Sequence, residues 1–253
     1  WLNDINNYHN TGDMNRCWSD GPCTKNGDFF GLDDIATEKP VVYQGWGDVY
    51  GSWIEKYGFV GFRVDTARHV DDEFFKNWSP LINQRAASAG IKNFTIFGEV
   101  WEQNPIDLVT YIRIHKMQTA LDFPFQKFAV DYAAASSNAS ILKNLFDYDD
   151  YYTSSFSSSS NLVTFLGNHD MGRSAFLIER VKVNPADQLL PRVKLANTLL
   201  YLSRGTPVVY YGDEVGMLGS ESGNDQRARQ DMFPTQVEMW KTEKRLGSKP
   251  IGN

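Results

Sequence analysis

The stretch Gly58-Phe-Val-Gly-Phe-Arg-Val-Asp65 decides the fold class, because it is an apolar run of strand type that ends in charge. Two other segments have the same form, Phe94-Thr-Ile-Phe-Gly-Glu99 and Leu162-Val-Thr-Phe-Leu-Gly-Asn-His-Asp170. Buried parallel strands are continuous apolar runs, and active sites of α/β barrels lie at the carboxyl ends of such strands. We therefore expect Asp65, Glu99 and Asp170 to meet at one mouth.

Helical patterns separate these strands. Apolar residues recur at helical spacing between the charged strand ends, and Gly90 is a C-terminal cap signal after one such run. A strand, a helix and a further strand make the βαβ unit of a parallel sheet. We predict helices at 45–57, at 74–86, at 126–146 and at 187–203, with Pro191 suggesting that the last one starts at that residue.

Opposed carboxylates on one site are the groups that glycoside hydrolysis requires. One acid protonates the leaving oxygen, and another attacks the anomeric carbon or stabilises the cation that forms there. A lone Arg-x-Asp on a strand is most often a structural ion pair, and a lone Glu after Gly at a strand end is usually a solvated loop residue. The joint occurrence of three such strand ends favours the catalytic interpretation.

Three motifs follow one another in a fixed order: Gly61-Phe-Arg-Val-Asp-Thr-Ala-Arg-His69, Gly98-Glu-Val100 and Asn168-His-Asp170. A fourth segment, Gly205-Thr-Pro-Val-Val-Tyr-Tyr-Gly-Asp-Glu214, looks like a last barrel strand with its loop. Through these motifs the sequence resembles the α-amylase family of glycoside hydrolases.

This resemblance implies a role for each acid. Asp65 becomes the nucleophile, Glu99 the general acid/base, and Asp170 the acid that grips the sugar hydroxyls and favours the transition state. Arg63 lies two residues before Asp65 on the same side of the strand, where its charge would keep that carboxylate ionised. Glu99 is flanked by apolar residues with no adjacent cation in the sequence, so desolvation would raise its pKa.

Other residues are candidates for binding the sugar. His169 donates a hydrogen bond to a sugar hydroxyl by resemblance, while Arg68 and His69 have either a role in the site or an ordinary solvated position at a turn. Trp101, Tyr8 and Trp18 are candidate stacking platforms, although most aromatic rings of a domain fill its core.

The predicted fold is a partial (β/α)8 barrel. A complete barrel takes roughly 250 residues before insertions, and this chain of 253 residues holds only five recognisable barrel strands. The resemblance makes these strands four to eight: residues 1–44 would belong to the loop-rich insertion after strand three, and residues 45–253 to the C-terminal part of the barrel, truncated at both ends. The predicted strands are 59–65, 94–100, about 119–123, 162–167 and 207–211. We expect such a piece, when it is isolated, to be inactive on starch and either to self-associate or to bind the dye ANS.

A structural calcium ion is implied by the same resemblance. Its ligands would include Asp34, in Leu32-Asp-Asp-Ile35, and the backbone carbonyl of His69, whereas the asparagine of the family's first motif does not occur here. The alternative is that Asp33 and Asp34 form a turn or begin a helix.

Composition and cysteine content limit the possible binding partners and the cellular location. A net charge of −6 and a pI near 5.2 argue against nucleic acid as a binding partner. The sequence contains no run of eighteen apolar residues, so it predicts no membrane span. Cys17 and Cys23 could close a small disulfide loop, and two cysteines alone do not make a zinc site. Since polymeric glucan cannot cross a membrane, we expect an extracellular or periplasmic location, although no signal peptide is visible.

The sequence therefore predicts a retaining α-glycosidase that hydrolyses α-1,4-glucan, such as starch or maltodextrin, through a covalent glycosyl-enzyme. One alternative keeps the chemistry in a cyclomaltodextrinase, a pullulanase-like enzyme or a transglycosylating relative. An alternative of another class is a non-catalytic carbohydrate-binding or interaction barrel.

Overall fold

The computed structural model describes residues 1–14, 21–181, 186–219, 225–232, 234–241 and 245–246. The chain folds as two compact units. Unit 1 comprises Trp1–Glu102, Ile106–Leu121 and Ser154–Ser157, and unit 2 comprises Gln103–Pro105, Asp122–Thr153 and Ser158–Asn253. The boundary predicted at residue 44 separates a loop-rich insertion from the barrel, which is not the division between these two units, and it stays a prediction.

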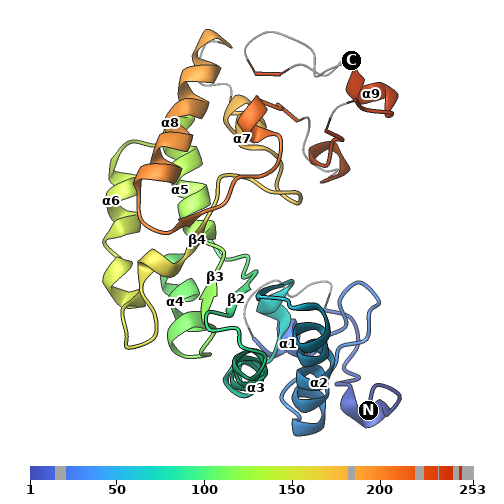
Figure 1. Ribbon diagram of the computed structural model, residues 1–253. Coiled ribbons are helices and arrows are strands. Elements are labelled where there is room, and N and C mark those ends of the chain that lie inside the picture. Colours follow the sequence, from blue (N-terminus) through green and yellow to red (C-terminus); the bar gives the residue numbers. More distant parts are fainter. Residues whose placement is uncertain (15–20, 182–185, 220–224, 233, 242–244, 247–253) are drawn as a thin grey trace. The chain divides into compact units, whose positions relative to one another are not determined.

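Unit 1 is built around a parallel sheet of three strands in the order β1-β2-β3, of which β2 and β3 are labelled in Figure 1. Its strands are β1 (Gly61–Val64), β2 (Thr95–Gly98) and β3 (Thr119–Ala120), with Val64 beside Gly98 and Phe97 beside Thr119. Helix α3 (Phe74–Ser88) connects β1 to β2, and α4 (Pro105–Arg113) lies between β2 and β3 in the chain. The predicted alternation of parallel strands with helices is confirmed here.

Gly98 ends β2 at a point where no side chain fits. A Cβ atom there would lie 2.4 Å from Met117 Sδ and 2.9 Å from Ala67 Cβ. The glycine therefore lets the end of the strand, and with it Glu99, pack closely against the turn that follows β1.

The remaining elements of unit 1 are α1 (Pro22–Asn26), α2 (Pro40–Tyr57) and the 3-10 helices η1 (Ile5–Asn7) and η2 (Ala67–His69). Helix α2 packs on α3. It begins five residues before the predicted position 45, because Pro40 occupies its first turn, where proline is favourable. It ends at Gly58, whose φ of 70° suits glycine.

Unit 2 contains a pair of parallel strands covered by helices. Strand β4 (Val163–Thr164) pairs with β5 (Thr206–Pro207). Helices α5 (Phe123–Ala133), α6 (Ser140–Phe146) and α8 (Leu189–Leu202) pack with α5 in the middle (Figure 1), and α7 (Ser174–Glu179) packs on α5 and α8. Their apolar faces form one buried cluster that includes Phe125, Leu166 and Leu200.

The shorter elements of unit 2 are η3 (Asp149–Tyr152), η4 (Ser159–Asn161), η5 (Ala186–Gln188), η6 (Asp213–Val215), η7 (Asp225–Ala228) and α9 (Glu238–Lys241). Among the residues that the structure describes, no helix combines the length and the apolar character that a membrane span needs.

Two helix predictions in unit 2 are wrong in their boundaries. The segment predicted as one helix over 126–146 is two helices, because Ala135 has a φ of 58° and the Asn138 carboxamide accepts the Ser140 N–H at 2.9 Å to start α6. Helix α8 begins at Leu189 rather than at Pro191. Proline is tolerated there because the first turn of a helix has no partner for its backbone N–H groups.

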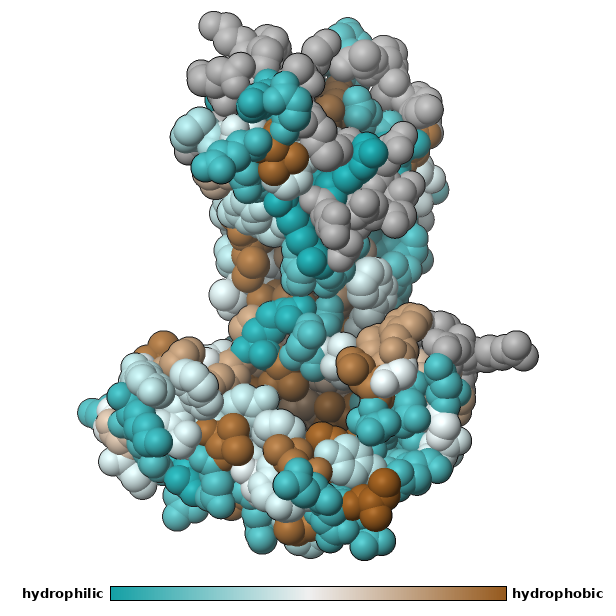
Figure 2. All heavy atoms as spheres, turned by 90° about the vertical axis from the view of Figure 1, so that its right-hand side faces the viewer, coloured by the Kyte–Doolittle hydropathy of each residue, from teal (hydrophilic) through white to brown (hydrophobic). Residues whose placement is uncertain are grey.

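The five predicted strands have counterparts among the described residues, but each is shorter than expected, and β5 shares only Pro207 with the strand predicted at 207–211. Residues that flank them are open to solvent, with Val60 66% and Val208 41% exposed. Figure 2 shows further hydrophobic side chains at the surface of unit 1. Exposed apolar strand ends agree with the expected self-association of the isolated chain, which stays a prediction.

Candidate active site

Asp65 and Glu99 come from neighbouring strand ends in unit 1. Each residue directly follows its strand, and the register pairs Val64 with Gly98 immediately before them. The Glu99 N–H donates to the Val64 carbonyl at 2.8 Å, which extends the ladder by one bond. The sequence prediction that strand ends bring these two acids together is confirmed.

Arg63 binds both carboxylates with one guanidinium. Its Nη1 donates to Asp65 Oδ1 at 2.7 Å, and its Nη2 lies 3.2 Å from Glu99 Oε1. The expected position of Arg63 on the same side as Asp65 is confirmed. The sequence neighbours of Glu99 include no cation, but the parallel register brings the long arginine of β1 within reach of the end of β2.

Burial is the largest influence on Glu99 and raises its pKa above the ordinary value of a glutamic acid. A side-chain hydrogen bond with Asp65 and the charge of Asp65 raise the pKa further, whereas the Thr66 N–H and the Arg63 charge lower it. Glu99 is 7% exposed, so desolvation outweighs the lowering contacts. The predicted direction of the shift is thus confirmed, and the pair can hold a proton on Glu99.

Thr66 is held in a strained backbone conformation beside this pair. Its φ is 45°, in the left-handed region that a β-branched residue rarely adopts. Its N–H donates to Glu99 Oε2 at 3.1 Å. Strain of this kind persists only where the surroundings hold it, and it clusters at functional sites.

Arg68 and Trp101 lie together at the same strand ends. Arg68 Nη1 donates to the Trp101 carbonyl at 2.5 Å, and its Nη2 lies 3.5 Å from Glu102 Oε2. The Trp101 residue is 42% exposed. An exposed ring two residues after Glu99 agrees with a stacking platform, while binding of substrate by Arg68 stays a prediction.

Asp65 also lines a cavity of about 460 Å³ within unit 1, together with Arg63, His69 and Asp34. The His69 Nδ1 lies 3.2 Å from the Thr24 carbonyl, and its ring packs on Phe29. These contacts fix the imidazole from the loop side. A direct contact of His69 with substrate stays a prediction.

Asp170 and His169 lie in unit 2, in a tight turn after β4. The Asn168 carboxamide oxygen accepts the N–H groups of Asp170 at 2.9 Å and Met171 at 2.8 Å. His169 Nε2 lies 3.1 Å from Asp170 Oδ2. The turn therefore presents the acid and the imidazole side by side. That Asp170 meets Asp65 and Glu99 at one mouth stays a prediction.

Arg229 is a neighbour of Asp170 that the sequence did not reveal. Its Nη2 donates to Asp170 Oδ1 at 2.9 Å, and its Nε donates to the His169 carbonyl at 3.2 Å. The two partners are 59 residues apart in the chain, and no motif surrounds Arg229.

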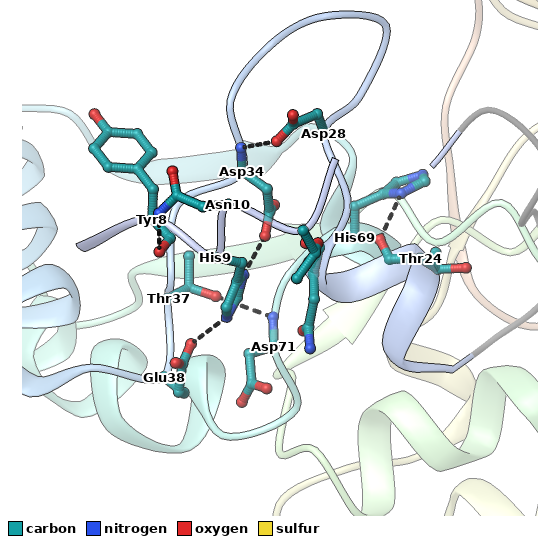
Figure 3. A network of polar contacts seen from close by, with 12 residues as sticks. Tyr8, His9, Asn10, Thr24, Asp28, Asp34, Thr37, Glu38, His69 and Asp71 are labelled. Carbon is teal, nitrogen blue, oxygen red and sulfur yellow. Dashed lines mark hydrogen bonds and ion pairs between the residues drawn. The ribbon is translucent and has the colours of Figure 1, made fainter. Parts of the chain in front are cut away.

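Asp34, the predicted calcium ligand, is engaged by a histidine (Figure 3). His9 Nδ1 contacts Asp34 Oδ2, and His9 Nε2 lies 3.2 Å from Glu38 Oε2. The Asp34 N–H donates to Asp28 Oδ1 at 3.1 Å. Burial raises the pKa of Asp34 to about 6, although the His9 contact opposes this.

These side chains do not fit a calcium site. Calcium takes six to eight oxygen ligands, whereas an imidazole lies on the Asp34 carboxylate. Within the described part of the chain, no three His, Cys, Asp or Glu side chains come together as a metal site. Calcium therefore stays an expectation from the resemblance, and no step of the reaction is derived through it. The predicted Cys17–Cys23 disulfide and the candidate Trp18 include residues outside the described ranges.

His9→Ala should lower the free energy of unfolding by about 1–3 kcal/mol, since Asp34 and Glu38 lose their shared partner inside the loop. Urea unfolding of this variant is compared with that of Asn3→Ala, a change at an exposed residue of the same loop. A chelator of divalent metal is tested on the unaltered protein as well. If the chelator lowers the urea midpoint of unfolding while the His9→Ala substitution leaves that midpoint unchanged, a metal rather than His9 holds Asp34.

Parallel strands that end in paired carboxylates, with an arginine between them, define an α/β domain of the glycoside hydrolase type. Residues 25–247 match the description "Alpha amylase, catalytic domain", and the chain belongs to this family. The resemblance noted in the sequence is thereby confirmed.

Three similar proteins illustrate the relationship. An alpha-amylase of Streptomyces lividans is 41% identical over 98% of this chain and 27% of its own length. A cyclomaltodextrinase of Thermoanaerobacter pseudethanolicus is 28% identical over 73% of this chain and 29% of its own. An alpha-amylase of Geobacillus thermoleovorans, solved in complex with acarbose, is 28% identical with a TM-score of 0.75, over 93% of this chain and 50% of that one.

The chain thus spans less than a third of these curated relatives and half of the solved structure. Likeness to α-amylase structures over nearly the whole chain confirms the predicted fold class, part of a (β/α)8 barrel.

Proposed function

We propose that this chain is part of the catalytic domain of a retaining α-glycosidase that hydrolyses α-1,4-glucan, such as starch or maltodextrin. The observation that carries the proposal is the Asp65–Glu99 pair, held by Arg63 at adjacent strand ends. The similar Geobacillus enzyme binds acarbose, which supports an oligosaccharide as the substrate class.

Asp65 attacks the anomeric carbon while Glu99 gives its proton to the leaving oxygen. Arg63 donates a hydrogen bond to the attacking carboxylate and so stabilises its negative charge, while burial raises the pKa of Glu99 and favours the protonated form of the acid. The C–O bond to the leaving sugar breaks as the bond to Asp65 forms. Glu99, now ionised, then takes a proton from the water that releases the sugar from Asp65.

Retention follows from the closeness of the two carboxylates. Retaining enzymes place them about 5–5.5 Å apart, and inverting enzymes about 6.5–9.5 Å apart to admit a water molecule. Here one guanidinium reaches both groups, and a hydrogen bond joins them. A pair that one guanidinium bridges in this way supports the short separation of a retaining enzyme.

Asp170 and His169, from unit 2, are proposed to bind sugar hydroxyls. Asp170 is fixed by its own turn and is 30% exposed at its side chain, so its carboxylate can still meet a ligand. Trp101, Arg68 and His69 are proposed to contact further parts of the glucan. An extracellular or periplasmic location is part of the proposal, since the polymer cannot cross a membrane.

The alternatives are weaker. A cyclomaltodextrinase is among the relatives but is less similar than the Streptomyces alpha-amylase. A non-catalytic barrel is not favoured, because all three acids are present and the Asp65–Glu99 pair has the geometry that the chemistry needs.

The complete protein should therefore hydrolyse maltooligosaccharides with release of the α-anomer first, as proton NMR of the early products can follow. Cyclomaltodextrin, tested in parallel, should be cleaved more slowly than the linear chain. Early formation of the β-anomer would contradict retention, and faster cleavage of the ring would favour the cyclomaltodextrinase alternative.

A further inference from the structure

We propose that Arg229 is a positioning residue that orients the Asp170 carboxylate and the adjacent His169 backbone for contact with the sugar. This inference rests on the proposed function, in which Asp170 grips the substrate. It adds a residue that the sequence motifs do not include.

One guanidinium fixes two successive residues of the turn after β4. Arg229 reaches Asp170 Oδ1 through Nη2 and the His169 carbonyl through Nε, while His169 Nε2 faces the other oxygen, Asp170 Oδ2. Each of the two Asp170 carboxylate oxygens therefore has a neighbouring group that fixes its direction. Because the guanidinium is planar and its donors are fixed relative to one another, the position of Asp170 Oδ1 is set relative to the His169 backbone carbonyl.

The residues on either side of Arg229 are clamped. The Tyr210 hydroxyl donates to the Ala228 carbonyl at 2.7 Å, and the Tyr211 hydroxyl donates to the Gln230 carbonyl at 2.5 Å. Arg229 is thus presented from a short segment that two tyrosines hold, rather than from a freely moving loop.

A buried arginine supports this clamp. Arg173 is fully buried, and its Nε donates to Gln230 Oε1 at 2.6 Å. Its Nη1 donates to Asp213 Oδ1 at 3.0 Å, and its guanidinium lies 4.7 Å and 5.0 Å from the ring centres of Tyr210 and Tyr211. A supporting shell of this kind reduces the motion of the group that contacts the functional residue.

Stability alone does not explain the contact between Arg229 and Asp170. The two side chains are 43% and 30% exposed, and ion pairs at such positions contribute little to folding. If Arg229 had only a structural role, replacing it would change kcat, KM and the melting temperature only slightly. A positioning role predicts a selective effect on turnover.

The test compares Arg229→Gln and Arg229→Lys in the complete protein with Arg180→Gln, which removes an exposed arginine at the end of α7. We expect Arg229→Gln to lower kcat on maltooligosaccharides about 10- to 100-fold, as loss of such supporting partners does. KM and the melting temperature should stay nearly unchanged. Arg229→Lys should recover only part of the loss, and Arg180→Gln should behave like the unaltered protein.

A double-mutant cycle with Asp170→Asn shows whether Arg229 acts through Asp170. Once Asp170 is Asn, Arg229→Gln should have almost no further effect on kcat. Unchanged kcat in Arg229→Gln, or full additivity of the two changes, would overturn the inference while leaving the proposed function intact. Full activity of Asp170→Asn would instead remove the proposed role of Asp170, and the role of Arg229 with it.

Discussion

In the complete protein, Asp65→Asn should lower kcat for an activated maltoside by about 10⁴-fold or more, the size of loss expected when a covalent nucleophile is removed. The asparagine side chain keeps the shape of the carboxylate but lacks the charge that attacks the anomeric carbon. Folding should be almost unaffected, because the Asp65 side chain is 69% exposed and surface ion pairs contribute little.

Asp48→Asn is the matched control for this experiment. Asp48 is also an exposed carboxylate of unit 1 that pairs with an arginine, Arg85, and it lies on helix α2 away from the strand ends. It should retain normal turnover. If Asp65→Asn keeps more than a few per cent of the original kcat, Asp65 is not the nucleophile.

Glu99→Gln produces a loss that depends on the leaving group. On maltooligosaccharides, whose leaving oxygen needs a proton, kcat should fall about 10²- to 10⁴-fold. On an aryl glycoside whose leaving group departs as a stable anion, formation of the glycosyl-enzyme should be nearly normal. Stopped-flow measurement of aryl release separates this step from the second one, which also requires Glu99.

The pH dependence of turnover is an independent test of the role of Glu99. Glu99 acts as an acid only while it is protonated, and burial raises its pKa. Turnover should therefore persist above the ordinary range of a glutamic acid and fall as the pH rises through the raised pKa. The glutamine variant should lack this alkaline limb. Glu55→Gln, at an exposed glutamate paired with Arg85, is the control. In the leaving-group experiment, an equal loss of kcat in Glu99→Gln on substrates with good and poor leaving groups would exclude Glu99 as the general acid.

The strand ends were predictable from the sequence because buried parallel strands leave a simple signal. The apolar runs before Asp65 and Glu99 are long, and parallel strands carry their last residues to the same edge of the sheet. The adjacency of the two acids follows from this alone. The contact of Arg63 with Glu99 does not, since it depends on the register between two strands whose paired residues are 34 positions apart in the chain.

Features decided by single long-range contacts could not be predicted. The break between α5 and α6 is a local exception: Ala133-Ala-Ala135 favours a helix, but Ser136-Ser-Asn138 after it carries a helix-start signal that the prediction of one helix passed over. His9 meets Asp34 across 25 residues, and Arg229 meets Asp170 across 59. Each contact joins charged residues that lie in irregular segments, where no periodic pattern exists to align them.

In the proposed reaction, the single guanidinium shared by Asp65 and Glu99 would also let the site change its own acidity between the two halves of the cycle. Before attack, the charge on Asp65 adds to burial in raising the pKa of Glu99, against the lowering influence of Arg63. Once Asp65 carries the sugar as an ester, it is neutral, and the positive charge of Arg63 acts on Glu99 alone. The pKa of Glu99 must then fall, which a titration of Glu99 with and without a trapped sugar can follow. The residue that begins the cycle as a proton donor is thereby converted into a base at the moment when water has to be deprotonated.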